Sequence, residues 1–243
     1  MQEVCIVIPC YNEEKRLKKE ALSDFLINNP SISFCFVNDG SSDNTLGVVN
    51  ELKKNQPDRI YIVNLEINKG KSEAVRLGIM NMFQINKFDA IGFWDADLST
   101  PLSEIDNLLN SLNSNKKNIA ALGSRVKRLG ANIQRSAFRH ILGRVFSTFS
   151  NWILKIPVYD SQCGAKVFKH EIIDIAFKEP FITKWLFDLE ILVRIRNHSH
   201  ILGSGIVEVT LLQWKEVVGS KLRFSDYILV PIDLMKIHYF YNK

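Results

Sequence analysis

The first half of the chain alternates short apolar runs with longer segments of helical periodicity. Five apolar runs predict strands, at Val4–Pro9, Ser33–Asn38, Ile60–Leu65, Ala90–Trp94 and Ala120–Gly123. The first predicted helix begins at about Glu13, the second ends at about Asn55, and the third ends near Phe83. A fourth helix is predicted to begin at Thr100-Pro101, where Thr100 can cap it. Runs that are apolar throughout, rather than alternating, are typical of parallel strands covered on both faces. The pattern predicts an α/β fold with a mostly parallel central sheet flanked by helices.

After about residue 124 the pattern loosens. Arg125–Gln134 is predicted to be a basic loop, and Arg135–Ile156 an amphipathic helix with an apolar stripe opposite a basic face. This helix packs on the sheet or lies at a membrane surface, and both interpretations stay open. The C-terminal segment Leu222–Tyr241 is apolar but interrupted by Asp226, Pro231 and Asp233. We expect it to join the amphipathic helix in peripheral contact with anionic lipid.

Composition narrows the setting of the protein. With 243 residues the chain can bury one large core, and its net charge of +5 suits anionic substrates or an anionic membrane surface without demanding them. The four cysteines stand singly, without metal-ligand spacing, which predicts buried reduced thiols and a cytosolic compartment. No secretory signal opens the sequence and no run reaches the roughly 18 apolar residues of a membrane span. We therefore expect a cytoplasmic protein held peripherally on the cytoplasmic face of a membrane, with no nucleic-acid partner.

The fourth apolar run ends in two carboxylates, Asp95 and Asp97. In an extended segment residues i and i+2 project to the same face, so both can converge on one cation. One or two carboxylates completed by water and substrate phosphates form the usual Mg²⁺ or Mn²⁺ arrangement. The pair predicts metal-assisted chemistry on a diphosphate. A solvated turn that caps the next helix is the alternative.

Other polar residues follow the predicted strands at the same edge. In open α/β sheets ligands bind beyond the carboxyl ends of the strands, which here carry Tyr11, Glu13 and Asp39 as well as the aspartate pair. Asp39 can accept hydrogen bonds from a base or a ribose hydroxyl, or it can be an ordinary turn residue. The first strand lacks a Gly-x-Gly-x-x-Gly turn, which disfavours a nicotinamide oxidoreductase, and no Walker-type loop occurs.

Several motifs together resemble a known family. Pro9-Cys-Tyr-Asn-Glu13, Asn38-Asp-Gly-Ser-Ser-Asp43, Asn68-Lys-Gly-Lys71 and Asp95-Ala-Asp97 occur in the order and spacing of inverting family-2 glycosyltransferases with a GT-A fold. The second half is similar to dolichyl-phosphate β-glucosyltransferases and their bacterial polyprenyl-phosphate relatives. That similarity is carried by Gly123-Ser-Arg125, Arg135-Ser-x-x-Arg139, Asp160-Ser-Gln-Cys-Gly-Ala-Lys166, Trp185-Leu-Phe-Asp-Leu-Glu190 and Trp214-Lys-Glu-Val-Val-Gly-Ser-Lys221. Leu98 and Gln162-Cys-Gly164 depart from the mannosyl-transferring relatives and favour the glucosyl branch.

The resemblance implies a division of roles within one GT-A domain spanning residues 1–243. Residues 1–123 would form the nucleotide-sugar-binding half, 124–221 the acceptor half, and 222–243 a C-terminal amphipathic segment. The residues implied to bind the nucleotide sugar are Pro9, Tyr11, Glu13, Asp39, Lys71, Asp95, Ala96 and Asp97, with Asp95 and Asp97 also holding the metal. The residues implied in catalysis are Asp97, Arg125, Arg139, Asp188 and Lys221.

The implied reaction moves a hexose, by resemblance glucose, from a UDP-sugar to a polyprenyl phosphate. A phosphate monoester is mostly dianionic at neutral pH and needs no general base. Lys166 joins the candidates for holding the anionic groups, and Asp188 would orient the sugar or a basic side chain. Asp188 and Glu190 can instead be acidic residues on the polar face of a helix. Transfer to a saccharide hydroxyl, with Asp188 as base, and an inactive nucleotide-sugar-binding subunit stay open as alternatives.

Overall fold

The computed structural model describes residues 2–199, 205–217 and 224–241, without the side chains of 137–142, 199 and 224–229. The chain forms two compact units. The first unit comprises Met1–Leu98 and Gly164–Pro180, and the second comprises Ser99–Cys163 and Phe181–Lys243. These boundaries differ from the expected division at residues 123 and 221, and the single-domain organisation stays a prediction.

The first unit is an α/β layer structure around five strands. Its elements are β1 (Val4–Cys10), α1 (Lys19–Asn28), β2 (Ile32–Asp39), α2 (Thr45–Asn55), β3 (Ile60–Leu65), α3 (Lys71–Ile85), β4 (Ala90–Trp94), β7 (Ala165–Lys169) and α6 (His170–Phe177). The strands lie in the order β3-β2-β1-β4-β7. The first four are parallel, and β7 runs antiparallel to β4. The predicted mostly parallel sheet flanked by helices is confirmed.

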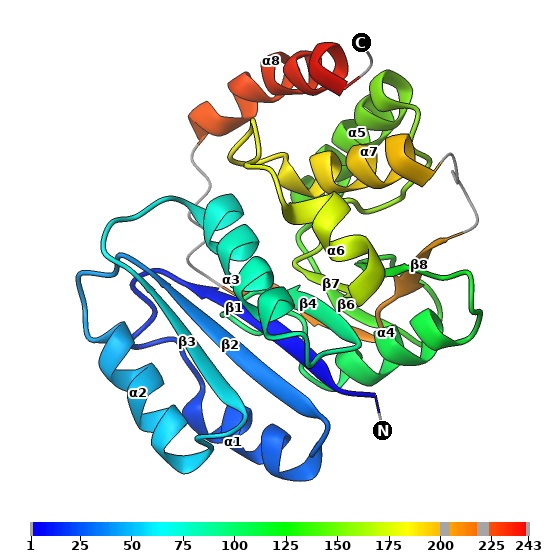
Figure 1. Cartoon of the computed structure of the whole chain (residues 1–243). Helices are drawn as coiled ribbons and strands as arrows, with labels where there is room; N and C mark the ends of the chain where they lie inside the picture. The colour runs from blue at the N-terminus through cyan, green and yellow to red at the C-terminus, as the bar shows by residue number, and fades with distance from the viewer. Residues whose placement is uncertain (1, 200–204, 218–223, 242–243) are drawn as a thin grey trace. The chain divides into compact units, whose positions relative to one another are not determined.

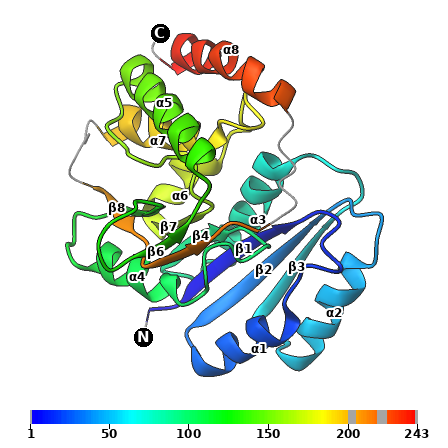
Figure 2. The same cartoon turned by 180° about the vertical axis from the view of Figure 1, so that it is seen from behind.

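Helices cover both faces of this sheet. The helices α1 and α2 pack beside each other on one face, and α3 packs with α6 on the other (Figures 1 and 2). Every residue of β2 and β4 is buried, as expected for strands that are apolar throughout. Gly78 lets α3 approach closely, because an added Cβ would lie 2.5 Å from Val7 and 2.6 Å from Val37.

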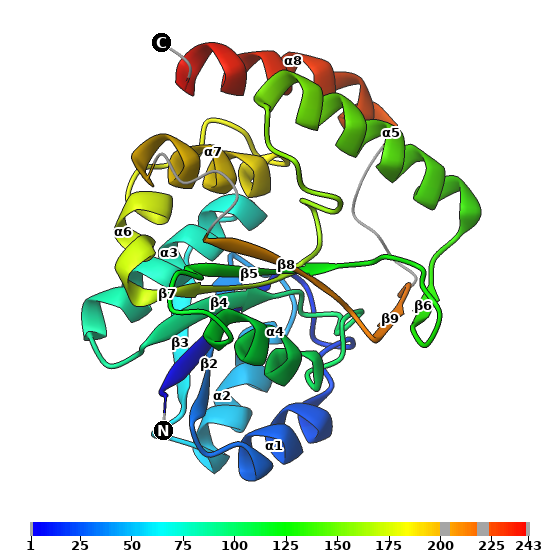
Figure 3. The same cartoon turned by 90° about the vertical axis from the view of Figure 1, so that its right-hand side faces the viewer.

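The second unit contains two short parallel strand pairs and four long helices among its described residues. Its elements are α4 (Glu104–Asn113), β5 (Ala120–Ser124), β6 (Asn132–Gln134), α5 (Ala137–Leu154), α7 (Phe187–Ser199), β8 (Ile206–Thr210), β9 (Gln213–Lys215) and α8 (Phe224–Tyr241). Strand β5 pairs with β8, and β6 with β9. Helix α8 lies beside α5 and also contacts α7 (Figure 3). Within the described part of the chain, no helix combines the length and the apolar character needed to cross a bilayer.

Two helices begin later than the sequence predicts. Helix α1 begins at Lys19 rather than near Glu13. The carbonyl of Glu13 accepts the N–H groups of Arg16 and Leu17, so this segment forms a single turn that does not continue into the helix. Helix α4 begins at Glu104 with Ser103 at its N-cap, so the predicted cap at Thr100 is wrong. The carbonyl of Pro101 accepts the Glu104 N–H, an i to i+3 bond that makes this stretch a tight turn. The prediction of buried, reduced thiols is confirmed, since all four cysteines are buried and none of them forms a disulfide bond.

Candidate active site

The polar loops of the first unit meet at one edge of its sheet. The register places Cys10 of β1 beside Asn38 of β2, and Val7 of β1 beside Phe93 of β4. These parallel strands therefore end at a common edge, where the loops carrying Glu13, Asp39 and the aspartate pair begin. Of the other predicted residues, Pro9 lies in β1, Tyr11 is partly exposed in the next loop, and Ala96 is buried.

The two aspartates lie on a tight, strained turn. The N–H of Leu98 donates to the carbonyl of Asp95 at 3.1 Å, and Leu98 has a φ of 51°. The left-handed region costs a residue with a Cβ about 1–2 kcal/mol, so it is rarely adopted without a functional or packing reason. This turn presents Asp95 and Asp97 at the sheet edge with their side chains 35% and 24% exposed.

A basic side chain lies against each aspartate. Lys71 Nζ, at the start of α3, is 2.5 Å from Asp95 Oδ1. Arg16 Nη2 is 3.5 Å from Asp97 Oδ2, and its Nε is 3.3 Å from the buried carboxylate of Glu13. The ion pairs thus join the loop after β1 and the start of α3 to the turn that carries Asp95 and Asp97. Arg16 was missed from the sequence, although its position three residues after Glu13 is the available signal.

Asp39 is nearly fully buried and holds the loop before α3. Its two carboxylate oxygens accept the backbone N–H groups of Lys69 at 2.7 Å and Gly70 at 2.9 Å. Gly70 has a φ of 91°, a conformation that favours glycine. These bonds fix a distant loop, at Lys69 and Gly70, rather than the turn of the Asp-Gly-Ser-Ser segment that was the alternative for Asp39. A carboxylate has about four acceptor sites, so these two bonds leave capacity for a nucleoside.

The loops after β1 and β2 brace each other. The N–H of Glu13 donates to Thr45 Oγ1 at 2.8 Å, and Ser42 N–H donates to Asn12 Oδ1 at 2.8 Å. Asp43 accepts the N–H groups of Glu14 and Thr45. Burial acts to raise the pKa of Asp43, but its hydrogen bonds with Thr45 and Glu14 outweigh burial and lower the pKa. The Asn-Asp-Gly-Ser-Ser-Asp motif thus fixes the loop that carries Glu13.

Gly164 lies against Asp95. The carbonyl of Gly164 accepts the Asp95 N–H at 2.9 Å, and an added Cβ would lie only 1.9 Å from Asp95 Oδ2. Only a glycine leaves room for the carboxylate in this position. Two residues later, Lys166 is fully buried, with its Nζ 5.3 Å from the centre of the Phe93 ring.

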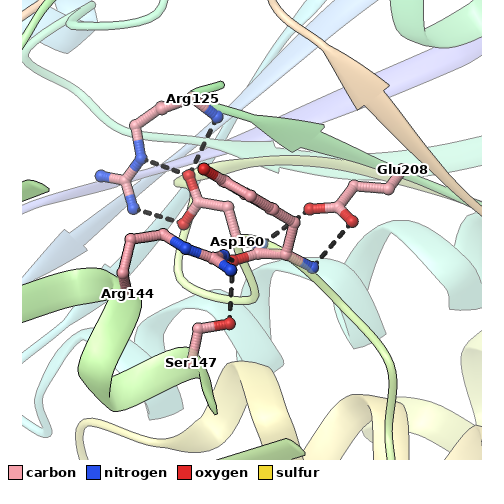
Figure 4. Close-up of polar contacts among 6 residues, drawn as sticks. Arg125, Arg144, Ser147, Asp160 and Glu208 are labelled. Atoms are coloured by element: carbon pink, nitrogen blue, oxygen red, sulfur yellow. Dashed lines mark hydrogen bonds and ion pairs between the residues drawn. The ribbon is translucent and has the colours of Figure 1, made fainter. Parts of the chain in front are cut away.

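In the second unit, Arg125 forms a bidentate ion pair with Asp160. Its Nε and Nη2 each lie 2.7 Å from a carboxylate oxygen, and its backbone N–H donates to the same carboxylate at 3.0 Å (Figure 4). Burial acts to raise the pKa of Asp160, but the charge and hydrogen bonds of Arg125 lower the pKa to about 2. The guanidinium also lies over the ring of Trp214, 5.4 Å from its centre. Three motifs of the second half therefore meet at Arg125.

The loop that carries Asp160 is fixed on both sides. Glu208 of β8 accepts the backbone N–H groups of Tyr159 at 2.8 Å and Asp160 at 2.6 Å. From α5, Ser147 Oγ donates to the Tyr159 carbonyl at 2.8 Å, and the Arg144 guanidinium stacks on the Tyr159 ring at 3.6 Å (Figure 4). Arg144 and Glu208 were not identified from the sequence.

A small polar pocket beside this pair is rich in arginine. It is lined by Arg125, Arg135, Arg144, Ser147, Ser161 and Gln162, among others. Burial lowers the pKa of Arg135, and the neighbouring charge of Arg125 lowers it further, against the opposing effect of Asp160. Among the described residues, the pocket lining holds three arginines and one carboxylate, Asp160, and Glu216 also acts on Arg135. The excess of positive charge in the lining favours an anion.

The remaining predicted residues separate into two groups. Asp188 lies buried in the first turn of α7. Glu190 is structural, because its carboxylate accepts the N–H groups of Ile182 and Thr183. The side chain of Arg139 and all of Lys221 lie outside the described residues.

The residues available for a metal are few. Among the described residues, no group of three or more His, Cys, Asp or Glu side chains is arranged to hold a metal ion. Asp95 and Asp97 supply two carboxylates that lie two residues apart. This donor set suits a hard divalent cation that takes its other ligands from water and a bound diphosphate.

Comparisons with known proteins find relatives that align with most of the chain. A model of glycosyl transferase family 2 matches residues 5–175. A dolichyl-phosphate β-glucosyltransferase of Trichomonas vaginalis is 31% identical over 251 residues, covering 98% of this chain and 74% of the relative. The enzyme of that name from Homo sapiens is 32% identical over 253 residues, covering 97% and 75%.

Solved structures show the same fold. Glucosyl-3-phosphoglycerate synthase from Mycobacterium tuberculosis, in complex with Mn²⁺, UDP-glucose and phosphoglyceric acid, has a TM-score of 0.69 with 17% identity, covering 98% of this chain and 80% of that one. At this identity the likeness concerns the fold, and it supports the GT-A architecture expected from the motifs.

Proposed function

Because the chain belongs to glycosyl transferase family 2, we propose that it transfers a glucosyl group from UDP-glucose to the phosphate of a polyprenyl lipid, with inversion at the anomeric carbon. The observation that carries the proposal is that Asp39, at the end of β2, and Asp95 and Asp97, on the turn after β4, lie at one sheet edge. Hydrogen bonds and an ion pair fix these segments. The glucosyl donor and lipid acceptor are supported by relatives of that activity that align with nearly the whole chain.

The first unit would hold the donor. Asp39 and Tyr11 border the position of the nucleoside, and Asp95 and Asp97 that of the diphosphate. The two carboxylates fit Mg²⁺ or Mn²⁺, since they form an incomplete ligand set that a diphosphate can complete. Such a cation, when bound, supplies Lewis-acid stabilisation of the negative charge on the leaving diphosphate. The Leu98 turn and Gly164 hold the carboxylates in place, so that little reorganisation accompanies the reaction.

The second unit would hold the acceptor phosphate. Arg125 is already neutralised by Asp160, so we assign phosphate binding chiefly to Arg135 and Arg144, with Arg125 completing the pocket wall. The acceptor dianion attacks the anomeric carbon, the carbon–oxygen bond to the diphosphate breaks, and UDP leaves with the electron pair. No proton has to be removed from the nucleophile. The arginines then act by positioning and by offsetting charge.

Transfer to a saccharide hydroxyl is the second candidate, favoured by the buried carboxylate of Asp188. An alcohol must lose a proton, and a carboxylate shielded from water is a suitable base. A lipid phosphate would need Asp188 only to orient the sugar or a basic side chain.

We further propose that the enzyme acts at the cytoplasmic face of a membrane, held there peripherally. Helices α5 and α8 contact each other, and both carry exposed apolar side chains. We name this set the α5/α8 surface: Val145, Phe149, Trp152, Ile232, Met235, Tyr239 and Phe240. Trp152 is 75% exposed and Tyr239 64% exposed. Exposed aromatic residues of this kind are favoured at a lipid interface.

An assay with purified protein, UDP-glucose, Mn²⁺ and a short polyprenyl phosphate tests the reaction. Asp97→Ala should remove metal-dependent turnover. Asp188→Asn should keep at least about a tenth of the rate, because a phosphate acceptor needs no general base. With a hydroxyl acceptor, the loss of the base would lower the rate by about 10²-fold or more. Native turnover with a saccharide acceptor and not with the polyprenyl phosphate, together with its loss in Asp188→Asn while UDP binding stays intact, would favour the hydroxyl acceptor. No product in the native enzyme with a panel of UDP-sugars and either acceptor would favour a binding subunit.

A further inference from the structure

We propose that Lys71 and Arg16 are exchangeable counter-cations of the aspartate pair. Without a donor, Lys71 holds Asp95 and Arg16 holds Asp97. When a metal–nucleotide complex binds, both cations pass from the carboxylates to the diphosphate. The inference rests on the proposed function, because it presumes a metal and a nucleoside diphosphate at this site.

The geometry assigns one cation to each carboxylate. Lys71 Nζ lies 2.5 Å from Asp95 Oδ1, and Arg16 Nη2 lies 3.5 Å from Asp97 Oδ2. Arg16 comes from the loop after β1 and Lys71 from the first turn of α3, so each approaches the Asp95–Asp97 turn on a separate element. Both are long side chains that can reorient without movement of the backbone.

The ion pairs are also weak enough to exchange. The side chains of Arg16 and Lys71 are 28% and 37% exposed. Partly exposed ion pairs contribute little net stability, because water already solvates both charges. The carboxylates fall short of a complete metal site, since no set of three suitable ligands occurs among the described residues. A metal that arrives alone must therefore displace two cations and gains only two protein ligands.

A bound diphosphate reverses this balance. It supplies oxygen ligands that complete the coordination of the metal, and it offers the displaced cations a new anion. Binding of metal and nucleotide should therefore be mutually dependent. Removing either Lys71 or Arg16 should change the affinity for the metal alone and the affinity for the nucleotide in opposite directions. The metal alone should bind more tightly, because a competing cation is gone, and the nucleotide should bind more weakly, because its diphosphate has lost a partner.

Isothermal titration calorimetry on the full chain tests this with two titrations. The first measures the Kd of Mn²⁺ alone, and the second measures the Kd of UDP in saturating Mn²⁺. For Arg16→Gln and for Lys71→Gln we expect Mn²⁺ alone to bind about threefold more tightly. We expect UDP to bind about tenfold more weakly. Arg16→Lys should return both constants toward those of the native protein.

Lys19→Gln is the matched control. Lys19 forms an ion pair with Glu51 at 3.0 Å in the same unit, and neither residue contacts the aspartate pair in the described ion pairs. Its loss should leave both constants within about twofold, as is typical for exposed pairs. Circular dichroism identifies any variant that fails to fold. If either Arg16→Gln or Lys71→Gln fails to fold, the binding constants of the other variant test the inference.

The outcomes separate the inference from the proposed function. Equal or weaker Mn²⁺ binding in folded Arg16→Gln and Lys71→Gln would overturn the counter-cation role, even if the native protein binds UDP with Mn²⁺. Absence of UDP binding to the native protein in saturating Mn²⁺ would overturn both the inference and the proposed function. A fall in both affinities would assign the two cations a purely structural role.

Discussion

Gly164 allows the Asp95 carboxylate its present direction, because glycine has no Cβ to occupy that space. A Cβ at this position would overlap Asp95 Oδ2 at 1.9 Å and Oδ1 at 2.6 Å. We predict that Gly164→Ala weakens the binding of UDP in saturating Mn²⁺ by about tenfold or more, because the carboxylate must turn away from its present position. Overpacking of this kind also lowers the free energy of unfolding by about 1–3 kcal/mol. Calorimetry and urea unfolding measure the two effects.

Gly47→Ala is the control for this substitution. Its added Cβ would meet the exposed side chain of Asn44 at 2.1 Å, and that side chain can rotate away. The affinity for UDP should therefore stay unchanged in Gly47→Ala. Native affinity in Gly164→Ala would show that the direction of Asp95 does not depend on Gly164.

Asp160 makes the free energy of unfolding depend on pH in the acidic range. Its pKa is about 2 in the folded chain against an ordinary 3.8, so the stabilisation is complete above about pH 4 and is lost as the pH falls toward 2. We predict that Asp160→Asn lowers the free energy of unfolding by about 2 kcal/mol at pH 6. The difference from the native protein should narrow between pH 4 and pH 2, since protonated Asp160 also leaves Arg125 without its anion. Urea unfolding at several pH values measures the difference.

Asp174→Asn serves as the comparison for Asp160→Asn. Asp174 lies 3.6 Å from Lys178, with both side chains at least half exposed, so its loss should matter little at any pH. A difference between native protein and Asp160→Asn that stays constant from pH 6 to pH 2 would contradict the assignment of this stabilisation to the charge of Asp160.

At the scale of elements, apolar pattern predicts the strands better than the starts of helices. Ile60–Leu65 and Ala90–Trp94 match β3 and β4. Every residue of β4 is buried, and a strand buried on both faces needs apolar side chains from end to end. The carbonyl of Glu13 accepts the N–H groups of Arg16 and Leu17 in a single turn, and α1 begins only at Lys19. The N–H groups of Glu13 and Glu14 bond to Thr45 and Asp43, so distant partners fix this turn outside the helix. Such a competition between local and distant partners is not written in the local sequence.

The candidate site shows the same limit. Sequence spacing predicts that the loops carrying Glu13, Asp39 and Asp95 meet, because parallel strands end at one edge. It does not predict which side chains pair at this edge, so Arg16 was not identified. In the second unit, the pairing of Arg125 with Asp160 was not identified either. The left-handed backbone of Leu98 has no sequence signal either, because leucine rarely adopts it.

At the scale of the whole chain, two passages between the units adjoin the candidate donor site in sequence. The chain leaves the first unit after Leu98, directly after the aspartate turn, and returns at Gly164, the residue that lies against Asp95. The arginine pocket and the α5/α8 surface belong to the intervening and following segments of the second unit. Under the proposed function, donor and acceptor recognition belong to separate units, so we expect substitutions to affect one substrate without the other.

Substitutions on the α5/α8 surface can separate recognition of the acceptor from recognition of the donor. We predict that Phe149→Ser with Trp152→Ser raises the KM for a long polyprenyl phosphate in anionic vesicles by about tenfold, because two exposed aromatic side chains no longer enter the lipid interface. Turnover of a short, water-soluble prenyl phosphate and the KM for UDP-glucose should stay within about twofold. Vesicle flotation at low salt should show reduced binding by the double variant, and Ile27→Ser, exposed in the first unit, provides the control. An equal loss of activity with both acceptors would show that the two aromatic residues support catalysis or folding rather than contact with lipid.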